Sequence, residues 1–140
     1  MTVFTLHPQL AQDCATVGEL PLSRLLLLND SRYPWLVLVP RRADLSEVFD
    51  LAPADRAALL EETCLVGEQL LRHCGGDKLN VGALGNLVPQ LHVHVVSRSV
   101  GDPAWPGPVW GHSAAQPYDE KAREARLALL RGALEGRLIT

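Results

Sequence analysis

The stretch Val88-Pro-Gln-Leu-His-Val-His-Val-Val-Ser-Arg98 decides how this sequence is interpreted. Between residues 90 and 96, polar and apolar side chains alternate, which is typical of a β-strand with one buried face. Alternate side chains share a face, so Gln90, His92 and His94 are expected on one side of the strand. Two imidazoles about 7 Å apart on one strand face are unusual beside a core. We therefore take this strand as the candidate active site.

The composition is that of a folded protein without a general nucleic-acid surface. At 140 residues the chain is long enough for one core and short for two, so we expect a single domain over residues 1–140. An apolar content of 47% fits a packed protein rather than a disordered one. A net charge of −3 argues against broad nucleic-acid binding but allows a small anionic ligand held locally.

The cysteines and the hydropathy pattern indicate the compartment. Cys14, Cys64 and Cys74 form no Cys-x-x-Cys pair, and three scattered cysteines favour reduced thiols over a disulfide framework. No run reaches the ~18 consecutive apolar residues of a membrane-spanning helix. The first residues have no signal-peptide pattern. We therefore expect a soluble, cytoplasmic protein with neither a membrane nor a nucleic acid as partner.

Strands are predicted in two groups, one early and one in the second half of the chain. They are expected at residues 16–19, 22–28, 34–39, 78–84 and 90–98. The four-residue link at 30–33 favours an antiparallel hairpin between the second and third strands. The last two strands should pair across a turn at Gly85-Asn86.

Helices are predicted before, between and after these strands. One or two helical turns should begin near Pro8, and Pro53 should open a long helix that ends at about His73. Asp119 has the side chain of an N-cap for a last helix that ends at about Leu134. Because the strands cluster instead of alternating with helices, the expected fold class is α+β with a mostly antiparallel sheet.

Each of the two longer helices is expected to bury one stripe of side chains. In the long helix the stripe follows the spacing i, i+4, i+7 and i+11. Its members are Leu60, Cys64, Gly67 and Leu71, broadened by Leu59, Thr63, Val66 and Leu70. In the last helix, Leu127, Leu130 and Leu134 should share the buried face.

The segment 101–111 is irregular, with three prolines and two tryptophans. Prolines exclude it from the interior of a helix or a sheet. Trp105 and Trp110 could pack the segment onto the core, which is the ordinary role of such residues. They could instead form a wall of the binding pocket or part of a subunit contact, and the sequence leaves all three roles open.

Three interpretations compete for His92 and His94. In the first, one imidazole attacks phosphorus and the other binds phosphate or protonates the leaving group. Imidazole suits this role because its ordinary pKa of about 6.5 leaves it mostly unprotonated near pH 7. In the second, both are Zn²⁺ ligands, with a third from His112, His73, His7 or a carboxylate. In the third, both are hydrogen-bonded on a solvated sheet face.

The sequence resembles the histidine triad (HIT) family of nucleotide hydrolases and transferases over residues 25–111. Members of this family carry His-x-His-x-His and two further apolar residues, where x is apolar. Gln90-Leu-His92-Val-His94-Val-Val96 matches with one departure, because Gln stands where the first His is expected. This form is similar to that of a bacterial HIT-like subgroup. The resemblance implies a HIT-like α+β fold with about five strands, a long helix and a carboxyl-terminal helix.

The resemblance also implies roles for individual residues. His92 would attack the α-phosphorus of a nucleotide and form a nucleotidyl-histidine intermediate, and His94 would contact the phosphate and the leaving group. Gln90 would replace the first histidine as a positioning residue by hydrogen bonding, without any charge. The implied substrate-binding residues are Asn80, Asn86, Asn29 and Asp30. Asn29 and Asn86 are also ordinary turn formers.

The expected function is cleavage of a phosphoanhydride or phosphoramidate bond at a nucleotide α-phosphate. Purine nucleotides are the common substrates of the family, and dinucleoside polyphosphates are candidates. The chemistry requires no cofactor, although Mg²⁺ could accompany a polyphosphate substrate. The resemblance implies a homodimer, with Trp105, Trp110 and the long helix as candidate contacts. The alternative is a nucleotide-binding module that has lost turnover because Gln90 replaces a histidine.

Overall fold

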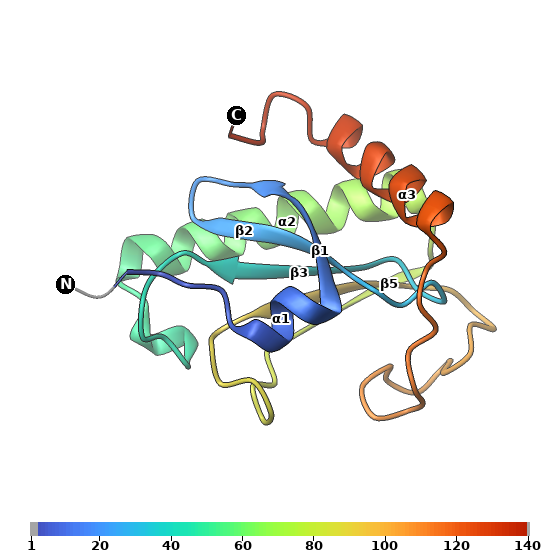
Figure 1. The fold of residues 1–140 in the computed structure, drawn as a ribbon, viewed down its shortest axis with the longest axis horizontal. Coiled ribbons are helices and arrows are strands. Elements are labelled where there is room, and N and C mark those ends of the chain that lie inside the picture. Colours follow the sequence, from blue (N-terminus) through green and yellow to red (C-terminus); the bar gives the residue numbers. More distant parts are fainter. Residues whose placement is uncertain (1–2, 140) are drawn as a thin grey trace.

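The computed structural model describes residues 3–139, which form an antiparallel sheet flanked by helices (Figure 1). The helices are α1 (Pro8–Asp13), α2 (Pro53–Cys74) and α3 (Glu120–Ala133), with a 3-10 turn η1 (Val48–Asp50). The strands are β1 (Cys14–Glu19), β2 (Ser23–Leu28), β3 (Trp35–Pro40), β4 (Lys78–Gly82) and β5 (Val93–Arg98). Their order in the sheet is β1-β2-β3-β5-β4, with every neighbouring pair antiparallel. The predicted α+β fold is confirmed.

Local sequence signals account for where the helices begin and end. Pro53 occupies the first turn of α2, where a missing N–H costs no hydrogen bond. The helix ends at Gly75, whose φ of 76° lies in the left-handed region that favours glycine. The side chain of Asp119 accepts a hydrogen bond from the N–H of Ala122 and so caps α3. These three predictions are confirmed.

The histidine strand begins later than predicted. β5 starts at Val93, and residues 90–92 are irregular. The N–H of Leu91 donates to the carbonyl oxygen of Leu45, so this part of the chain pairs with the connector before α2 and not with β4. Pro89 has no N–H to offer a neighbouring strand. Consequently the predicted shared face of Gln90 and the two histidines does not form.

The buried stripe of α2 is displaced from its predicted centre. Leu60 is 63% exposed and Cys64 is also exposed. The buried positions are Leu59, Glu62, Val66, Gly67 and Leu70. A Cβ at Gly67 would lie 2.7 Å from Cδ1 of Leu79 in β4, so glycine allows the helix to approach the sheet there. This contact turns Gly67 toward the sheet and leaves Leu60 in solvent.

The sheet has two faces of different composition. On the helical face, α2 and α3 cover aliphatic side chains of four strands, and the predicted stripe of α3 is buried there. These strand residues are Val17, Leu25, Leu27, Leu36, Leu38, Val93 and Val95. On the opposite face, which we call the pocket face, α1 and irregular segments cover a second cluster (Figure 1). Its strand residues are Leu26, Trp35, Val37, Val39 and Val96.

The β1 edge of the sheet is covered by the carboxyl-terminal part of the chain. A bulge interrupts the pairing of β1 with β2 between Thr16 and Gly18. Arg131 of α3 donates to the carbonyl oxygens of Thr16 and Val17 at 2.8 and 2.9 Å. Glu19 forms an antiparallel bridge with Ile139. Among residues 3–139, no helix combines the length and the apolar character needed to cross a membrane.

Candidate active site

A cavity of about 460 Å³ opens on the pocket face beside the two histidines, and we call it the histidine pocket. Its wall comes from α1, the ends of β2 and β3, the loop between β4 and β5, and the segment after β5. The lining residues that matter for its chemistry are His92, His94, Trp35, Trp110, Asn86 and Asp30. Four predicted site residues therefore meet in one cavity.

Trp35 holds His94 in one tautomer. The indole N–H of Trp35 donates to Nδ1 of His94, with 3.0 Å between the nitrogens. Because Nδ1 accepts this hydrogen bond, the single proton of the neutral ring lies on Nε2. Burial lowers the pKa of His94 to about 4, and the neighbouring His92 contributes in the same direction. At neutral pH His94 is therefore an uncharged hydrogen-bond donor.

His92 is held in the opposite tautomer. Its Nδ1 lies 2.7 Å from the backbone carbonyl oxygen of Gln90. A carbonyl oxygen can only accept, so Nδ1 carries the proton and Nε2 keeps its lone pair. The side chain is buried, and the ring centroids of His92 and His94 are 4.9 Å apart. One ring thus offers a lone pair beside another that offers a proton, which is the pairing that nucleophilic attack on phosphorus requires.

Two tryptophans form an aromatic wall around His94. The rings of Trp35 and Trp110 each stand edge-on to the imidazole, with centroid separations of 5.7 Å. Trp110 therefore forms a pocket wall, which is one of the roles left open by the sequence. Trp105 lies elsewhere, over the guanidinium of Arg98. Sequence reasoning missed Trp35 because only the strand order places β3 next to β5.

Asn86 and Asp30 both line the histidine pocket, but the carboxylate of Asp30 is already hydrogen-bonded within the chain. Its carboxylate accepts hydrogen bonds from the backbone and the guanidinium of Arg32 at 2.9 to 3.2 Å. Burial alone would raise the pKa of Asp30, yet these bonds and one from the Gln116 N–H keep it below its usual value. Arg32 also lines the pocket, and its Asp-x-Arg spacing in a turn was a signal that we overlooked.

Asn80 and Asn29 lie outside the pocket lining. The side-chain oxygen of Asn80 accepts from Nη1 of Arg98 at 2.8 Å, and Asp102 takes two further donors of that guanidinium. The side-chain oxygen of Asn29 accepts from the N–H of Tyr118 at 2.9 Å. Asn80 thus ties β4 to β5, and Asn29, which follows β2, holds the segment before α3.

Gln90 also lies outside the lining of the histidine pocket. Its side-chain oxygen accepts from the N–H of His7, and its side-chain nitrogen donates to the carbonyl oxygen of Thr5, each at 2.8 Å. The side chain therefore points to the amino-terminal part of the chain. Of the two pocket histidines, Gln90 contacts His92 through its backbone carbonyl oxygen, which lies beside Nδ1 of that ring.

The described residues offer no third ligand for a Zn²⁺ ion bound by His92 and His94. Within residues 3–139, no three side chains of His, Cys, Asp or Glu come together in a group that could hold a metal ion. His7, which the sequence offered as a candidate ligand, accepts a hydrogen bond from the N–H of Gln9 at the start of α1. His112 instead lies beside Ser113.

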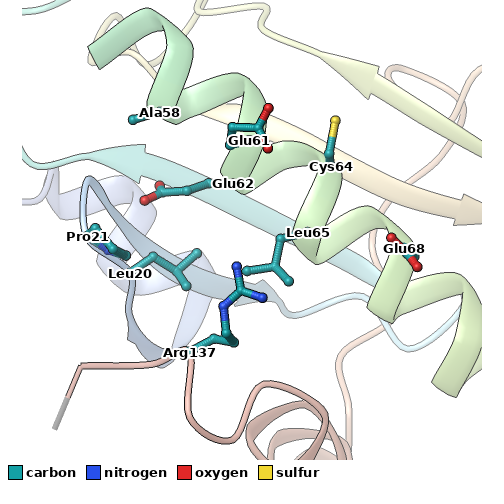
Figure 2. Close-up of a pocket in the computed structure, with 9 residues that line it drawn as sticks. All are labelled: Leu20, Pro21, Ala58, Glu61, Glu62, Cys64, Leu65, Glu68 and Arg137. Carbon is teal, nitrogen blue, oxygen red and sulfur yellow. The ribbon is translucent and has the colours of Figure 1, made fainter. Parts of the chain in front are cut away.

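A second cavity of about 420 Å³ lies between α2, the β1–β2 turn and Arg137 (Figure 2). Figure 2 shows Glu62 reaching from α2 toward Pro21 in that turn. The carboxylate of Glu62 accepts from the N–H groups of Leu22 and Ser23 at 2.8 and 3.1 Å, so it is committed to the fold. The two cavities are similar in volume, and of the two only the histidine pocket is lined by imidazoles.

Comparisons with known proteins agree with this geometry. A family model described as HIT domain matches residues 9–101. A histidine triad protein from Sinorhizobium meliloti 1021 is 50% identical, over 96% of this chain and 99% of that chain, with a TM-score of 0.92. One from Marinobacter aquaeolei VT8 is 44% identical, over 97% of this chain and 99% of that chain, with a TM-score of 0.94. One from Bradyrhizobium japonicum is 44% identical, over 94% of this chain and 98% of that chain, with a TM-score of 0.91. No curated protein matches the chain.

Proposed function

This chain belongs to the histidine triad (HIT) family, and on that premise we propose that it is a nucleotide hydrolase or nucleotidyl transferase. In the first step, Nε2 of His92 forms a bond to the α-phosphorus, and the bond from phosphorus to the leaving oxygen or nitrogen breaks. In the second step, water or another acceptor attacks the same phosphorus and releases the nucleotide from His92. The two steps have the form of covalent catalysis.

The opposite tautomers of the two histidines are the observation that carries this proposal. His92 presents a lone pair on Nε2 because its Nδ1 proton is used on the Gln90 carbonyl oxygen. His94 keeps a proton on Nε2 because Trp35 occupies its Nδ1. His94 can therefore donate to a phosphate oxygen or to the leaving group, which favours attack by its neighbour.

The pocket supports a nucleotide as the ligand. Its volume of about 460 Å³ falls in the usual range for small-molecule sites, about 300–1,000 Å³. Leu10, Leu28 and Val109 add an apolar wall suited to a base, for which we propose a purine. Asn86 offers its amide to phosphate oxygens from the loop between β4 and β5.

We also propose that no resident metal takes part in the chemical step. Attack by imidazole needs a free lone pair and a proton donor, and the two histidines supply both. Mg²⁺ could still accompany a polyphosphate substrate, where it would neutralise the charge of the leaving group. Turnover of a phosphoramidate in the presence of a chelator is the measurement that checks this point.

Intact-protein mass spectrometry tests the covalent mechanism. The protein is incubated with adenosine phosphoramidate, a diadenosine polyphosphate or ADP, and the mass of an added nucleotidyl group is sought. We expect the adduct in the natural chain and its loss in His92→Ala. His73→Ala is a matched control, because His73 lies at the end of α2 outside the pocket. If the natural chain gives neither adduct nor product, it is a nucleotide-binding module instead.

We propose, finally, that the protein works as a homodimer. β4 is an edge strand, and within residues 3–139 no strand pairs with its outer side. Val81 on this strand is 52% exposed, and exposed edges with apolar side chains are suited to pairing with another chain. Sedimentation should give twice the monomer mass, and Val81→Asp should weaken the association. A monomer at micromolar concentration would contradict the proposal.

A further inference from the structure

We propose that Gln90 is a positioning residue that clamps residues 3–7, the amino-terminal segment, beside the histidine pocket. In this role it shapes the pocket through its neighbours and has no direct contact with the reacting phosphate. The inference rests on the proposed function for its effect on turnover, but the clamp itself is a structural claim. Gln90, which stands where the family motif has a histidine, thus has a structural role.

The carboxamide of Gln90 bonds to the amino-terminal segment as the N–H and C=O of one residue in a parallel strand would. Its oxygen accepts from the N–H of His7, and its nitrogen donates to the carbonyl oxygen of Thr5. Both bonds are 2.8 Å long, and they lie on either side of Leu6. A parallel strand contacts its partner in the same way, with one donor and one acceptor flanking a residue. The amide orientation is unambiguous, because the Thr5 carbonyl only accepts and the His7 N–H only donates.

This clamp is connected to the pocket through α1. Leu6 packs against the hydrophobic cluster of the pocket face, which contains Trp35 and Leu10. The next residue, His7, caps α1 by accepting from the N–H of Gln9 at 3.0 Å. Leu10 of this helix then lines the pocket. A loss of the clamp would therefore loosen the wall that the helix provides.

Histidine could not do the same work at position 90. A neutral imidazole has one donor and one acceptor, but its two ring nitrogens point away from each other, whereas the carboxamide C=O and the N–H cis to it point to the same side. An imidazole could thus satisfy either Thr5 or His7 and would leave the other without its partner. On this reasoning Gln90→His breaks the clamp, and restoring the family motif does not raise turnover.

Hydrogen exchange of the backbone tests the clamp without any need for activity. Gln90→Met keeps the length of the side chain and removes both polar groups. We expect the amide hydrogen of His7 to exchange with solvent at least about tenfold faster, because the variant lacks the hydrogen bond that protects this N–H. An unchanged exchange rate at His7 would overturn the clamp.

A matched pair of variants isolates one of the two bonds. His7→Ala removes the side-chain cap of α1 and keeps the backbone N–H, whereas His7→Pro removes both. Proline fits here because φ of His7 is −56°. The difference between the unfolding free energies of the two variants therefore reports the hydrogen bond from the His7 N–H to Gln90. Gln90→Met should lower the free energy of unfolding by less in the His7→Pro background than in the natural chain, because only the bond to Thr5 is left to lose. A fully additive loss would contradict the inference.

Kinetics separate positioning from catalysis. Gln90→Met and Gln90→His should raise KM about tenfold and change kcat by less than about twofold, since the pocket wall is loosened and the two histidines remain. A fall in kcat at constant KM would overturn the inference and make Gln90 a catalytic residue. If the natural chain shows no turnover, the dissociation constant of AMP replaces KM. Faster exchange at His7 with unchanged nucleotide affinity would overturn the link from clamp to pocket.

Discussion

The helical face and the pocket face of the sheet use the same strands for different tasks. On β5, Val93 and Val95 point to the helical face, whereas His94 and Val96 point to the pocket face. The helical face is held by aliphatic side chains that require only complementary shape. On the pocket face, the rings of Trp35, His92 and His94 each have a named hydrogen-bond partner. One face therefore stabilises the fold, and the other sets the protonation state of the site.

The largest effect that distinguishes the faces is on turnover. His92→Ala should lower kcat by at least about 10³-fold, because no other described side chain offers a free imidazole nitrogen at that place. The melting temperature should change little in comparison. Single-turnover kinetics with a phosphoramidate measure the first quantity, and calorimetry measures the second. Retention of the adduct in this variant would move the nucleophile to another residue.

The next largest effect is a loss of stability caused by a substitution on the helical face. Leu70→Ala should lower the free energy of unfolding by about 2 to 5 kcal/mol, since it empties a fully buried position between α2 and the sheet. Nucleotide affinity should stay within about twofold of the natural value if the faces are independent. Denaturant titration and calorimetric binding check the two parts. A parallel loss of affinity would show that the faces are coupled.

A pH-dependent effect on stability should come from His94 on the pocket face. The pKa of His94 is about 4 in the folded chain, against about 6.5 for an ordinary histidine. Below pH 6.5 the unfolded chain takes up a proton more readily than the folded one, so this group destabilises the fold as pH falls toward 4. The loss should be on the order of 3 kcal/mol.

His94→Asn provides the reference for that loss. Because other groups also titrate between pH 6.5 and 4, the measurement is the difference between the unfolding free energies of the two proteins at each pH. The natural chain should lose stability relative to the variant over this window. Parallel curves would show that His94 titrates normally and is not held neutral.

The smallest predicted effect concerns the hydrogen bond from Trp35. Trp35→Phe keeps an aromatic ring but removes the donor, which should cost about 1 kcal/mol of unfolding free energy. The pKa of His94 should rise from its low value, because Nδ1 becomes free to take a proton. Nitrogen-15 NMR titration of the imidazole reports the tautomer and the pKa together. An unchanged tautomer would mean that some other group selects it.

Local signals were sufficient for most of the fold. The cap at Asp119, the proline at the start of α2 and the alternation around His94 each depend on neighbours within a few residues. The choice of His92 as candidate nucleophile came instead from the resemblance to the HIT family, because the local pattern alone left three roles open for the two histidines. Because helix caps and strand periodicity are short-range effects, one sequence is enough to predict them.

The remaining features of the site depend on partners far apart in the chain. Gln90 bonds to residues 83 and 85 positions away, and Trp35 meets His94 across 59 positions. Asn80 was expected to bind substrate, yet an arginine on the neighbouring strand engages its side chain. Such pairings depend on the strand order and on the residue where β5 begins, and the periodicity of the sequence predicts neither.

The asymmetry of the two sheet edges limits how far copies of this protein can associate. At β1, a bulge twists the backbone, and Arg131 and Ile139 already use the groups on that side. At β4 the outer edge stays available within the described part of the chain. Copies that joined β4 to β4 would bury the available edge of both sheets at once. In the proposed dimer, growth would therefore end at a closed pair, and the same edge would guard against a fibre.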